Sequence, residues 1–243
     1  MNLSLANNNN LDDLSEHYQK HGYVKLANAL ENASAEEIAS HIGIQEQWNL
    51  VFNHKGTHHD LNNVEVAEWD LNKKNDLLAI VNQQASSGFQ YFYETIPIYD
   101  IYYKNLMPGH FFNDIFEFLN TEKTLNLFRE LLSAPEITFA DGQITRFKAG
   151  HFLNCHKDDV DNKNRVAAFV INLTKNWRAD WGGALHILND ELQIEQSFLP
   201  TFNEINIFKI PVDHYVGYIP PFATGNRLSI TGWLRSGENP MTK

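Results

Sequence analysis

The sequence predicts a mainly β fold with flanking helices, in which a jelly-roll or barrel core is buttressed by helices from the N-terminal half. After Pro135, eight short apolar runs follow one another at close spacing. Turn residues such as Asp141-Gly142 and Pro220-Pro221 separate these runs. Short strands with regularly spaced turns are typical of jelly rolls and barrels. Before Pro135 the segments are longer, and several of them have helical periodicity.

The length of the chain fits one domain. It has 243 residues, a size that β barrels often reach as a single unit. No linker and no internal repeat divides the sequence. We therefore expect one domain over residues 1–243, with a mostly helical support region at 1–135 and the β core at 136–237.

Four segments of the N-terminal half have the apolar spacing and end signals of helices. Ser34 and Thr121 are suited to cap two of them. The segment 89–103, "FQYFYETIPIYDIYY", is rich in aromatic and β-branched residues and indicates a strand. Its tyrosines could line a pocket, although packing beneath helices with their hydroxyls at the rim is more common. The expected helices are 11–22, 34–43, 72–88 and 121–135.

The composition argues against several classes of protein. The 30 acidic residues outnumber the 19 basic ones, and the net charge of −11 disfavours a nucleic-acid partner. No apolar run reaches the length of about 18 residues that indicates a membrane span. The first residues have neither the basic nor the apolar region of a signal peptide. The single cysteine rules out an internal disulfide and favours a cytoplasmic protein.

The stretch "GHFLNCHKDD" contains the candidate metal ligands. If it lies on or just past a strand, His156 and Asp158 point to the same face because side chains alternate along a strand. His214, at the start of another expected strand, is the candidate third ligand. Two histidines and one carboxylate form the facial triad of non-haem Fe(II) oxygenases. A catalytic zinc site would accept the same ligands, so the spacing alone leaves both metals open.

A second signal comes from "NRLSITGWLR", which contains Arg227 with Ser229 and Thr231 on the same strand face. An arginine that faces into a barrel needs an anion to compensate its buried charge. Its planar guanidinium binds carboxylates with two hydrogen bonds. A dicarboxylate that binds a metal at one end would supply that anion at the other. Taken alone, Arg227 could instead pair with an acid at a sheet edge.

These residues together resemble the 2-oxoglutarate/Fe(II)-dependent dioxygenases, and the prolyl 4-hydroxylase-like branch in particular. The pattern consists of His156 and Asp158 as HxD, the distal His214 and the following Arg227. In that branch an aromatic-x-x-G-x-aromatic strand leads into HxD, as in "RFKAGHFLNCHKD" here. The segments "RVAAFVINLTKNW", "GGALHIL" and "RLSITGW" are also similar to it. The resemblance covers about residues 136–237.

The resemblance implies a double-stranded β-helix core with Fe(II) bound by His156, Asp158 and His214. It further implies that Arg227 binds the distal carboxylate of 2-oxoglutarate, with O₂ as the second co-substrate and ascorbate as a stimulatory reductant. Asn172 stands where relatives often have a tyrosine, and it could still donate a hydrogen bond to that carboxylate. Ser229 and Thr231 are further candidate co-substrate contacts. Phe147 also replaces a tyrosine that many relatives have.

The activity that the resemblance implies is hydroxylation of an unactivated C–H bond with release of succinate and CO₂. The presence of Asp158 distinguishes the chain from related halogenases, which replace this carboxylate with a small residue. A prolyl or other amino-acid residue in a protein or peptide is the expected substrate. Hydroxylation of a small molecule, such as a free amino acid or natural product, is the first alternative. A cupin-like metalloenzyme without a co-substrate and a non-catalytic β-sandwich module are the others.

Several other residues have simpler interpretations. The histidine-rich segment 54–60 is expected to be a solvated loop, although a lid over the site or a second metal site would also fit it. Cys155 should face away from the ligands as a buried structural thiol. His186 is expected to be a satisfied core or rim residue. Trp233 is expected to be a packing residue that could border the pocket, since it shares a strand face with Arg227.

Overall fold

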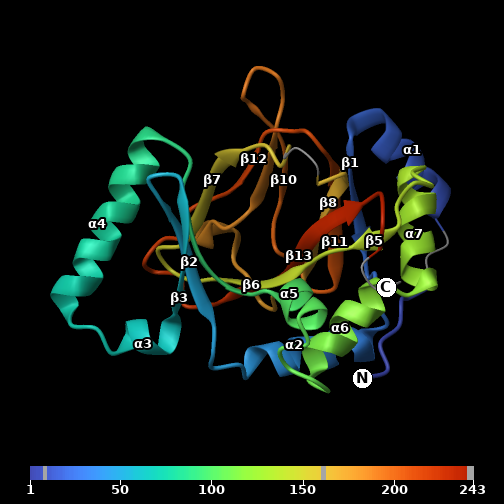
Figure 1. Cartoon of the computed structure of the whole chain (residues 1–243). Helices are drawn as coiled ribbons and strands as arrows, with labels where there is room; N and C mark the ends of the chain where they lie inside the picture. Colours follow the sequence, from blue (N-terminus) through green and yellow to red (C-terminus); the bar gives the residue numbers. More distant parts are fainter. Residues whose placement is uncertain (8–9, 160–162, 240–243) are drawn as a thin grey trace.

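The computed structural model describes residues 1–7, 10–159 and 163–239 and consists of one curled antiparallel sheet with helices outside it (Figure 1). The first strands are β1 (Tyr23–Ala27), β2 (Asn49–His54), β3 (Thr57–Asn62) and β4 (Tyr91–Ile96). The later strands are β5 (Phe139–Ala140), β6 (Gln143–Phe147), β7 (Phe152–His156), β8 (Arg165–Asn172), β9 (Leu185–Leu188), β10 (Ile194–Phe198), β11 (Glu204–Lys209), β12 (His214–Val216) and β13 (Arg227–Arg235). The helices are α1 (Leu11–His21), α2 (Asn32–Gly43), α3 (Asn63–Ala67), α4 (Leu71–Ser87), α5 (Ile98–Tyr103), α6 (Phe111–Leu119) and α7 (Glu122–Leu132), with a short 3₁₀ turn at Ala179–Trp181.

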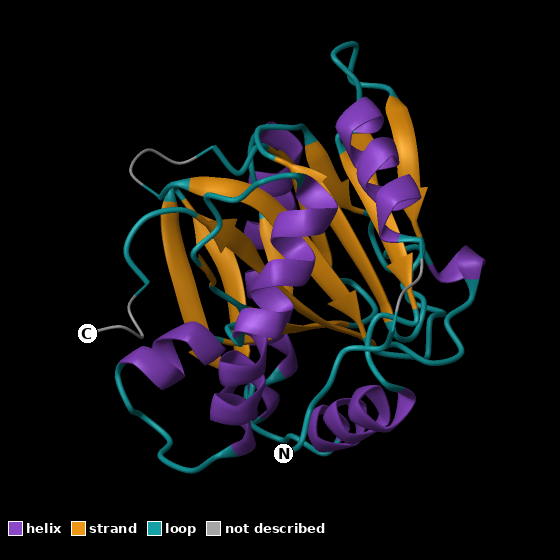
Figure 2. Ribbon diagram, turned by 90° about the vertical axis from the view of Figure 1, so that its right-hand side faces the viewer, coloured by secondary structure: helices purple, strands orange, loops and turns teal. Residues whose placement is uncertain are grey.

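The sheet runs in the order β1-β11-β8-β13-β6-β4-β7-β12-β9-β10, with the hairpin β2–β3 attached to β4 and β5 attached to β13. Its two end strands approach each other, since the ring of Tyr23 on β1 lies 5.9 Å from that of Phe198 on β10. The sheet therefore closes most of the way around its own interior. The turned view shows helices lying along the outside of the strands (Figure 2). None of the helices in the described part of the chain combines the length and apolarity needed to cross a membrane.

The central strands are buried on both faces. On β8, Phe169 and Ile171 point outward into the main hydrophobic core, which also contains residues of α1, α2, α5, α6 and α7. Ala168 and Val170 alternate with them. Both belong to a different apolar cluster and line the interior cavity. This alternation follows from the period of two along a strand. The helices thus stabilise one face of the strands while the other face is left to form a site.

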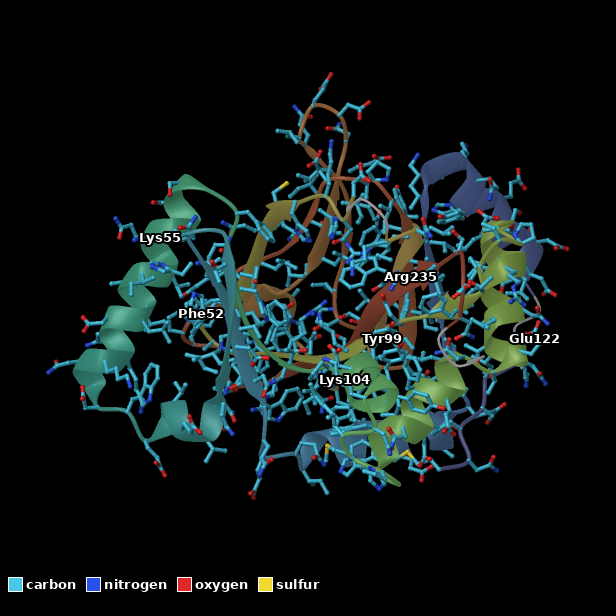
Figure 3. All side chains as sticks on the ribbon, in the orientation of Figure 1. Phe52, Lys55, Tyr99, Lys104, Glu122 and Arg235 are labelled. Carbon is cyan, nitrogen blue, oxygen red and sulfur yellow. The ribbon has the colours of Figure 1, made fainter. Side chains whose placement is uncertain are left out.

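A separate apolar cluster holds α4 against β2 and β4, on the side of the molecule away from α1 and α7 (Figure 1). Leu77 and Val81 of α4 pack with Phe52 of β2 and Phe92 of β4, and Figure 3 shows Phe52 between the hairpin and α4. Asp70 caps α4 by accepting a hydrogen bond from the amide of Lys73 at 2.9 Å.

The sequence-based fold class is confirmed by this architecture. The eight expected runs after Pro135 form the nine strands β5–β13, because the first run divides at Asp141 and Gly142 into β5 and β6. The region 1–135 is mostly helical and also contributes β1–β4 to the sheet. The helices expected at 11–22, 72–88 and 121–135 correspond to α1, α4 and α7, and Thr121 caps α7.

Two helical features differ from the expectation. The second helix begins at Asn32, so Ser34 lies inside it and is no cap. The Ser34 side chain is buried and its hydroxyl accepts a hydrogen bond from the amide of Ser4 at 3.0 Å. The helices α3 and α6 were not expected. The sequence of α6, "FFNDIFEFL", is so rich in apolar residues that helical periodicity is hard to distinguish in it.

The strand expected over 89–103 is wrong in its second half. Strand β4 ends at Ile96, and residues 98–103 form the helix α5. Pro97 lies between them at the N-cap of α5. Because proline has no N–H to donate to a sheet and its fixed φ suits the start of a helix, the ladder stops there.

The solvated loop expected at 54–60 is also wrong, since this segment is part of the hairpin β2–β3. Lys55 and Gly56 form its turn with φ values of 52° and 78°, and Figure 3 shows Lys55 near its end. Two consecutive residues with positive φ are typical of the tight turns that match the twist of a hairpin. Strand β3 is an exposed edge strand with polar residues on both faces, so the sequence has no apolar alternation to reveal it.

Candidate active site

The structure brings His156, Asp158 and His214 together at one end of the barrel interior. One potential ligand atom from each lies within 4.8 Å of the others. Nε2 of His156 is 3.5 Å from Oδ1 of Asp158, and Nε2 of His214 is 3.4 Å from Oδ2 of the same carboxylate. His156 and His214 lie opposite each other on β7 and β12. Among the residues that the structure describes, this is the one group of three or more with such spacing.

Both imidazoles are oriented with Nε2 toward the shared point. Nδ1 of His156 lies 2.9 Å from the carbonyl oxygen of Asn154, and Nδ1 of His214 lies 3.0 Å from that of Val212. A carbonyl oxygen only accepts hydrogen bonds, so each Nδ1 donates its proton to the backbone, and each Nε2 is the nitrogen that faces the Asp158 carboxylate. This is the arrangement that metal-binding histidines adopt in proteins.

Asp158 is held as a carboxylate. Burial acts to raise its pKa, but the hydrogen bonds from His156 and His214 outweigh burial and keep the pKa below its usual range. Trp233 donates from its indole N–H to Oδ2 at 2.8 Å. Arg165 donates to the backbone carbonyl of Asp158 at 3.0 Å. Two imidazole nitrogens and one carboxylate are a donor set that fits Fe(II) and, by chemistry alone, zinc.

The three residues open onto a cavity of about 300 Å³ inside the curled sheet. Its apolar wall is formed by Ala168, Val170, Leu185, Phe208 and Val216, among others. Arg227 lines the same cavity. A mostly apolar wall with a few convergent polar groups is typical of ligand sites.

Arg227 is a buried cation without an anionic partner. It is 2% exposed, and burial lowers its pKa to about 10, so it remains charged at neutral pH. Its guanidinium donates to Oγ of Ser229 at 3.4 Å and lies 5.1 Å from the ring centre of Phe147. Nε is buried and has no hydrogen-bond partner. No described carboxylate lies within 4.0 Å of the guanidinium, although 11 ion pairs of a lysine, an arginine or the N-terminal amine occur elsewhere in the described residues.

The other expected co-substrate contacts have different environments. Thr231 lines the cavity. Ser229 is fully buried between Arg227 and Thr145, whose hydroxyl lies 2.9 Å from its own. Asn172 does not line the cavity; its amide donates to Oδ1 of Asn206 at 2.7 Å.

Sequence reasoning missed Gln143 and Thr145 of the cavity wall, and it favoured packing over a place in the pocket for Tyr93. Tyr93, Gln143 and Thr145 face it from β4 and β6, and Gln143 donates to the Tyr93 hydroxyl at 3.3 Å. Burial raises the pKa of Tyr93 to about 12, so its phenol stays neutral. The period of two along "QITRF" could have indicated Gln143 and Thr145, but only once the pairing of β6 with Arg227 was known.

The mouth of the cavity is aromatic. Phe89 is 41% exposed, and its ring centre lies 5.1 Å from that of His156. The hydroxyl of Tyr91, a second wall residue, is 2.7 Å from Nδ1 of His58. The hairpin β2–β3 therefore contacts the wall of the cavity directly.

Other expectations about neighbouring residues have mixed outcomes. Cys155 faces away from the cavity, but it is exposed, so the expected buried thiol is wrong. His186 is at the rim, with Nδ1 2.8 Å from the Ser197 hydroxyl. Trp233 borders the cavity and contacts a candidate ligand, so it does more than pack.

Comparison with known proteins gives a consistent picture. Residues 142–235 match the family model of the 2OG-Fe(II) oxygenase superfamily. The chain is 31% identical over 101 residues to prolyl 3-hydroxylase OGFOD1 of Mus musculus, which covers 39% of this chain and 18% of that protein. The chain thus matches less than a fifth of that relative's length.

Two solved structures share the fold. A prolyl-4-hydroxylase from Pseudomonas putida aligns with a TM-score of 0.58 at 16% identity, over 94% of this chain and 100% of that one. A prolyl hydroxylase from Trichoplax adhaerens, in complex with a peptide fragment of a hypoxia inducible factor, aligns with a TM-score of 0.56 at 14% identity, over 93% and 89%. The matched segment contains all three candidate ligands and Arg227. Over residues 142–235 the chain resembles the 2OG-Fe(II) oxygenase superfamily, and its 101 residues that match the mouse protein resemble a prolyl hydroxylase.

Proposed function

We propose that this chain is an Fe(II)- and 2-oxoglutarate-dependent dioxygenase. It would hydroxylate an unactivated C–H bond and release succinate and CO₂. The observation that carries the proposal is the presence of the unpaired Arg227 guanidinium in the same cavity as His156, Asp158 and His214. A metal site alone would have no use for a buried, uncompensated cation.

In this proposal, His156, Asp158 and His214 hold Fe(II), and Arg227 binds the distal carboxylate of 2-oxoglutarate. Ser229 hydrogen-bonds the guanidinium and Thr231 lines the cavity beside it. The bound iron, with 2-oxoglutarate and O₂, supplies the oxidising power for the reaction. An enzyme without a co-substrate would leave Arg227 without an anion, which is why the cupin-like alternative is less favoured.

The remaining residues of the wall orient the ligands and exclude water. Phe147 lies beneath the Arg227 guanidinium and stacks on Tyr93 with ring centres 4.8 Å apart. The aliphatic residues on β8, β9 and β12 keep the space between the metal ligands and Arg227 apolar. A low local dielectric strengthens the interaction of Arg227 with a carboxylate.

A prolyl or other amino-acid residue in a peptide or protein is the proposed substrate. The relatives above are prolyl hydroxylases, and one of them is in complex with a peptide fragment. The open aromatic mouth formed by Phe89 and Tyr91 suits an extended chain that inserts one side chain. A free amino acid or small natural product is the alternative substrate.

Further parts of the proposal concern the setting of the reaction. Ascorbate should stimulate turnover. The single cysteine and the net charge of −11 support a cytoplasmic enzyme without a nucleic-acid partner. Residues 1–243 would form one domain, since β4 lies between β6 and β7 in the sheet and β1 pairs with β11.

The proposal is tested by anaerobic titration of the protein with Fe(II) and 2-oxoglutarate while the metal-to-ligand charge-transfer absorption is recorded. The wild type should develop the band, His214→Ala should not, and Arg227→Met should need much more 2-oxoglutarate. Arg178→Met is a matched control, because Arg178 is exposed and paired with Asp180. A wild type without the band, or a band that survives His214→Ala, would contradict the proposal.

The substrate is tested separately by mass spectrometry. Proline-containing peptides and free proline are incubated with the enzyme, Fe(II), 2-oxoglutarate and O₂. A gain of one oxygen on the peptides supports the peptide substrate. A gain confined to free proline supports the small-molecule alternative.

A further inference from the structure

We propose that Trp233 and Arg165 are positioning residues that hold the Asp158 carboxylate for the metal. This inference rests on the metal-binding part of the proposed function and is independent of 2-oxoglutarate. It begins from a difference between Asp158 and the two histidines. His156 is the last residue of β7 and His214 the first of β12, so a sheet ladder holds both of their backbones.

Asp158 lies beyond the end of β7, where no strand holds it. The alternation of a strand therefore does not by itself fix the direction of this carboxylate. A ligand displaced by about 1 Å would contribute little to metal affinity, since metal sites require their ligands within narrow limits of distance and angle. Other contacts must replace the missing ladder.

Trp233 supplies the first of these contacts. Its indole N–H donates to Oδ2 of Asp158 at 2.8 Å, which is a good hydrogen-bond distance. Oδ1, on the other side of the carboxylate, is 3.5 Å from Nε2 of His156. The hydrogen bond from Trp233 occupies one lone pair of Oδ2 and would thereby restrain the rotation of the carboxylate that would hold the metal.

Arg165 supplies the second contact and lies over the face of the indole. The central carbon of its guanidinium lies 3.5 Å from the centre of the Trp233 ring, a close cation–π distance. The same guanidinium donates to the backbone carbonyl of Asp158 at 3.0 Å and lies 3.8 Å from Oδ1. Arg165 therefore fixes the plane of the indole and the backbone of the ligand together.

Trp233 is itself held firmly by its backbone. Its amide donates to Oδ1 of Asp141 at 2.7 Å, and its carbonyl accepts from the Asp141 amide at 3.1 Å. Arg235, seen on the same strand in Figure 3, lies 3.4 Å from the other Asp141 oxygen. Gly232 permits this approach, because a Cβ there would lie 2.1 Å from the Asp141 carbonyl oxygen. The glycine before Trp233 thus allows Asp141 to hold the backbone of Trp233, and with it the position of the indole.

The main test is Trp233→Phe, which removes the N–H and keeps an aromatic ring for Arg165. We expect the dissociation constant for Mn(II) to rise about 10-fold, the lower end of the effect of losing a partner of a metal ligand. The visible spectrum of the Co(II)-substituted protein should also change. Trp177→Phe is the matched control, since the Trp177 indole donates to the Gly182 carbonyl at 3.0 Å and contacts no ligand.

Arg165→Lys is the second variant, because lysine keeps the charge but loses the planar stacking and the directed hydrogen bond. It should weaken Mn(II) binding and shift the Co(II) spectrum in the same direction as Trp233→Phe. Its matched control is Arg146→Lys. Arg146 also stacks on a tryptophan, Trp48, at 4.1 Å, and it pairs with Glu94 rather than with a ligand.

Thermal unfolding without metal separates this role from a purely structural one. If Trp233→Phe lowers the Tm but leaves the Mn(II) dissociation constant within twofold and the Co(II) spectrum unchanged, the inference is overturned. If the wild type binds Mn(II) normally but develops no absorption band with Fe(II) and 2-oxoglutarate, the proposed function fails while this inference stands. If the wild type binds no divalent metal, both fail.

Discussion

His156 and His214 lie directly opposite each other on β7 and β12 with ring centres 4.2 Å apart, although 58 residues separate them in the sequence. The pairing of two antiparallel strands therefore sets the distance between the two imidazoles. Asp158, two residues beyond His156, completes the set. A metal bound there would join two strands that the chain connects only through β8–β11.

Divalent metal should therefore stabilise the folded chain. At a free Mn(II) concentration 100 times the dissociation constant, the free energy of unfolding should rise by about 2.7 kcal/mol. Thermal or urea unfolding with and without Mn(II) measures this, and a chelator should reverse it. The stabilisation should vanish in His214→Ala. A similar gain in that variant would mean that Mn(II) binds elsewhere.

Arg227→Met should separate stability from ligand binding. The variant replaces a buried, unpaired cation by an apolar side chain of similar length, so we expect the Tm of the ligand-free protein to stay equal or rise. The rise in Tm that 2-oxoglutarate causes in the metal-loaded wild type should be lost. Differential scanning fluorimetry with and without 2-oxoglutarate checks both effects. A large fall in the Tm of the ligand-free variant would show that Arg227 has a structural partner.

His151 should make stability depend on pH. Burial lowers its pKa to about 4, whereas an unfolded histidine titrates near 6.5. Between these values the unfolded chain binds the extra proton, so the stability from this group is complete above pH 6.5 and is lost as the pH falls toward 4. The loss amounts to roughly 3 kcal/mol.

Urea unfolding of the wild type and of His151→Leu between pH 4 and 7 measures this effect. The variant should lose less stability on acidification. Buried Asp141, whose pKa is raised to about 6, has the opposite dependence but is present in both proteins. His17→Leu, at an exposed position, is the control and should follow the wild type. Equal slopes for the wild type and His151→Leu would contradict the prediction.

Phe89→Ala should affect the substrate and leave the co-substrate unchanged. Phe89 lies at the mouth of the cavity against His156, far enough out to be partly exposed. Loss of a contact worth about 1.4 kcal/mol would raise the KM for a peptide substrate about 10-fold. The affinity for 2-oxoglutarate should remain within twofold. Phe222→Ala, which removes a 64% exposed ring outside the cavity wall, is the control.

The sequence was sufficient for the fold class because the strands after Pro135 have strong local signals. Period-two alternation and turn pairs such as Asp141-Gly142 divide them clearly. The same rules failed for residues 57–62, whose strand is polar on both faces, and for 98–103, where Pro97 changes a strand into a helix. Pairing with β2 makes residues 57–62 a strand despite their polar composition. At 98–103 the single residue Pro97 outweighs a composition that favours a strand.

The candidate site was predictable in its ligands but not in its supporting contacts. The alternation of His156 and Asp158 is visible in the sequence, and so is an arginine on the strand of Trp233. The register that brings Thr145 beside Ser229 is set by long-range pairing, which one sequence does not reveal. The Asn172 amide bonds to Asn206, 34 residues away, which local pattern could not indicate.

The most direct test of the central claim is turnover under ¹⁸O₂. The wild type is incubated with Fe(II), ascorbate, 2-oxoglutarate and a proline-containing peptide, and succinate and peptide are analysed by mass spectrometry. Our account predicts succinate with one ¹⁸O atom and an equimolar peptide product with the other, both absent in His214→Ala. Succinate at the level of His214→Ala, with neither the peptide nor free proline labelled, would contradict it.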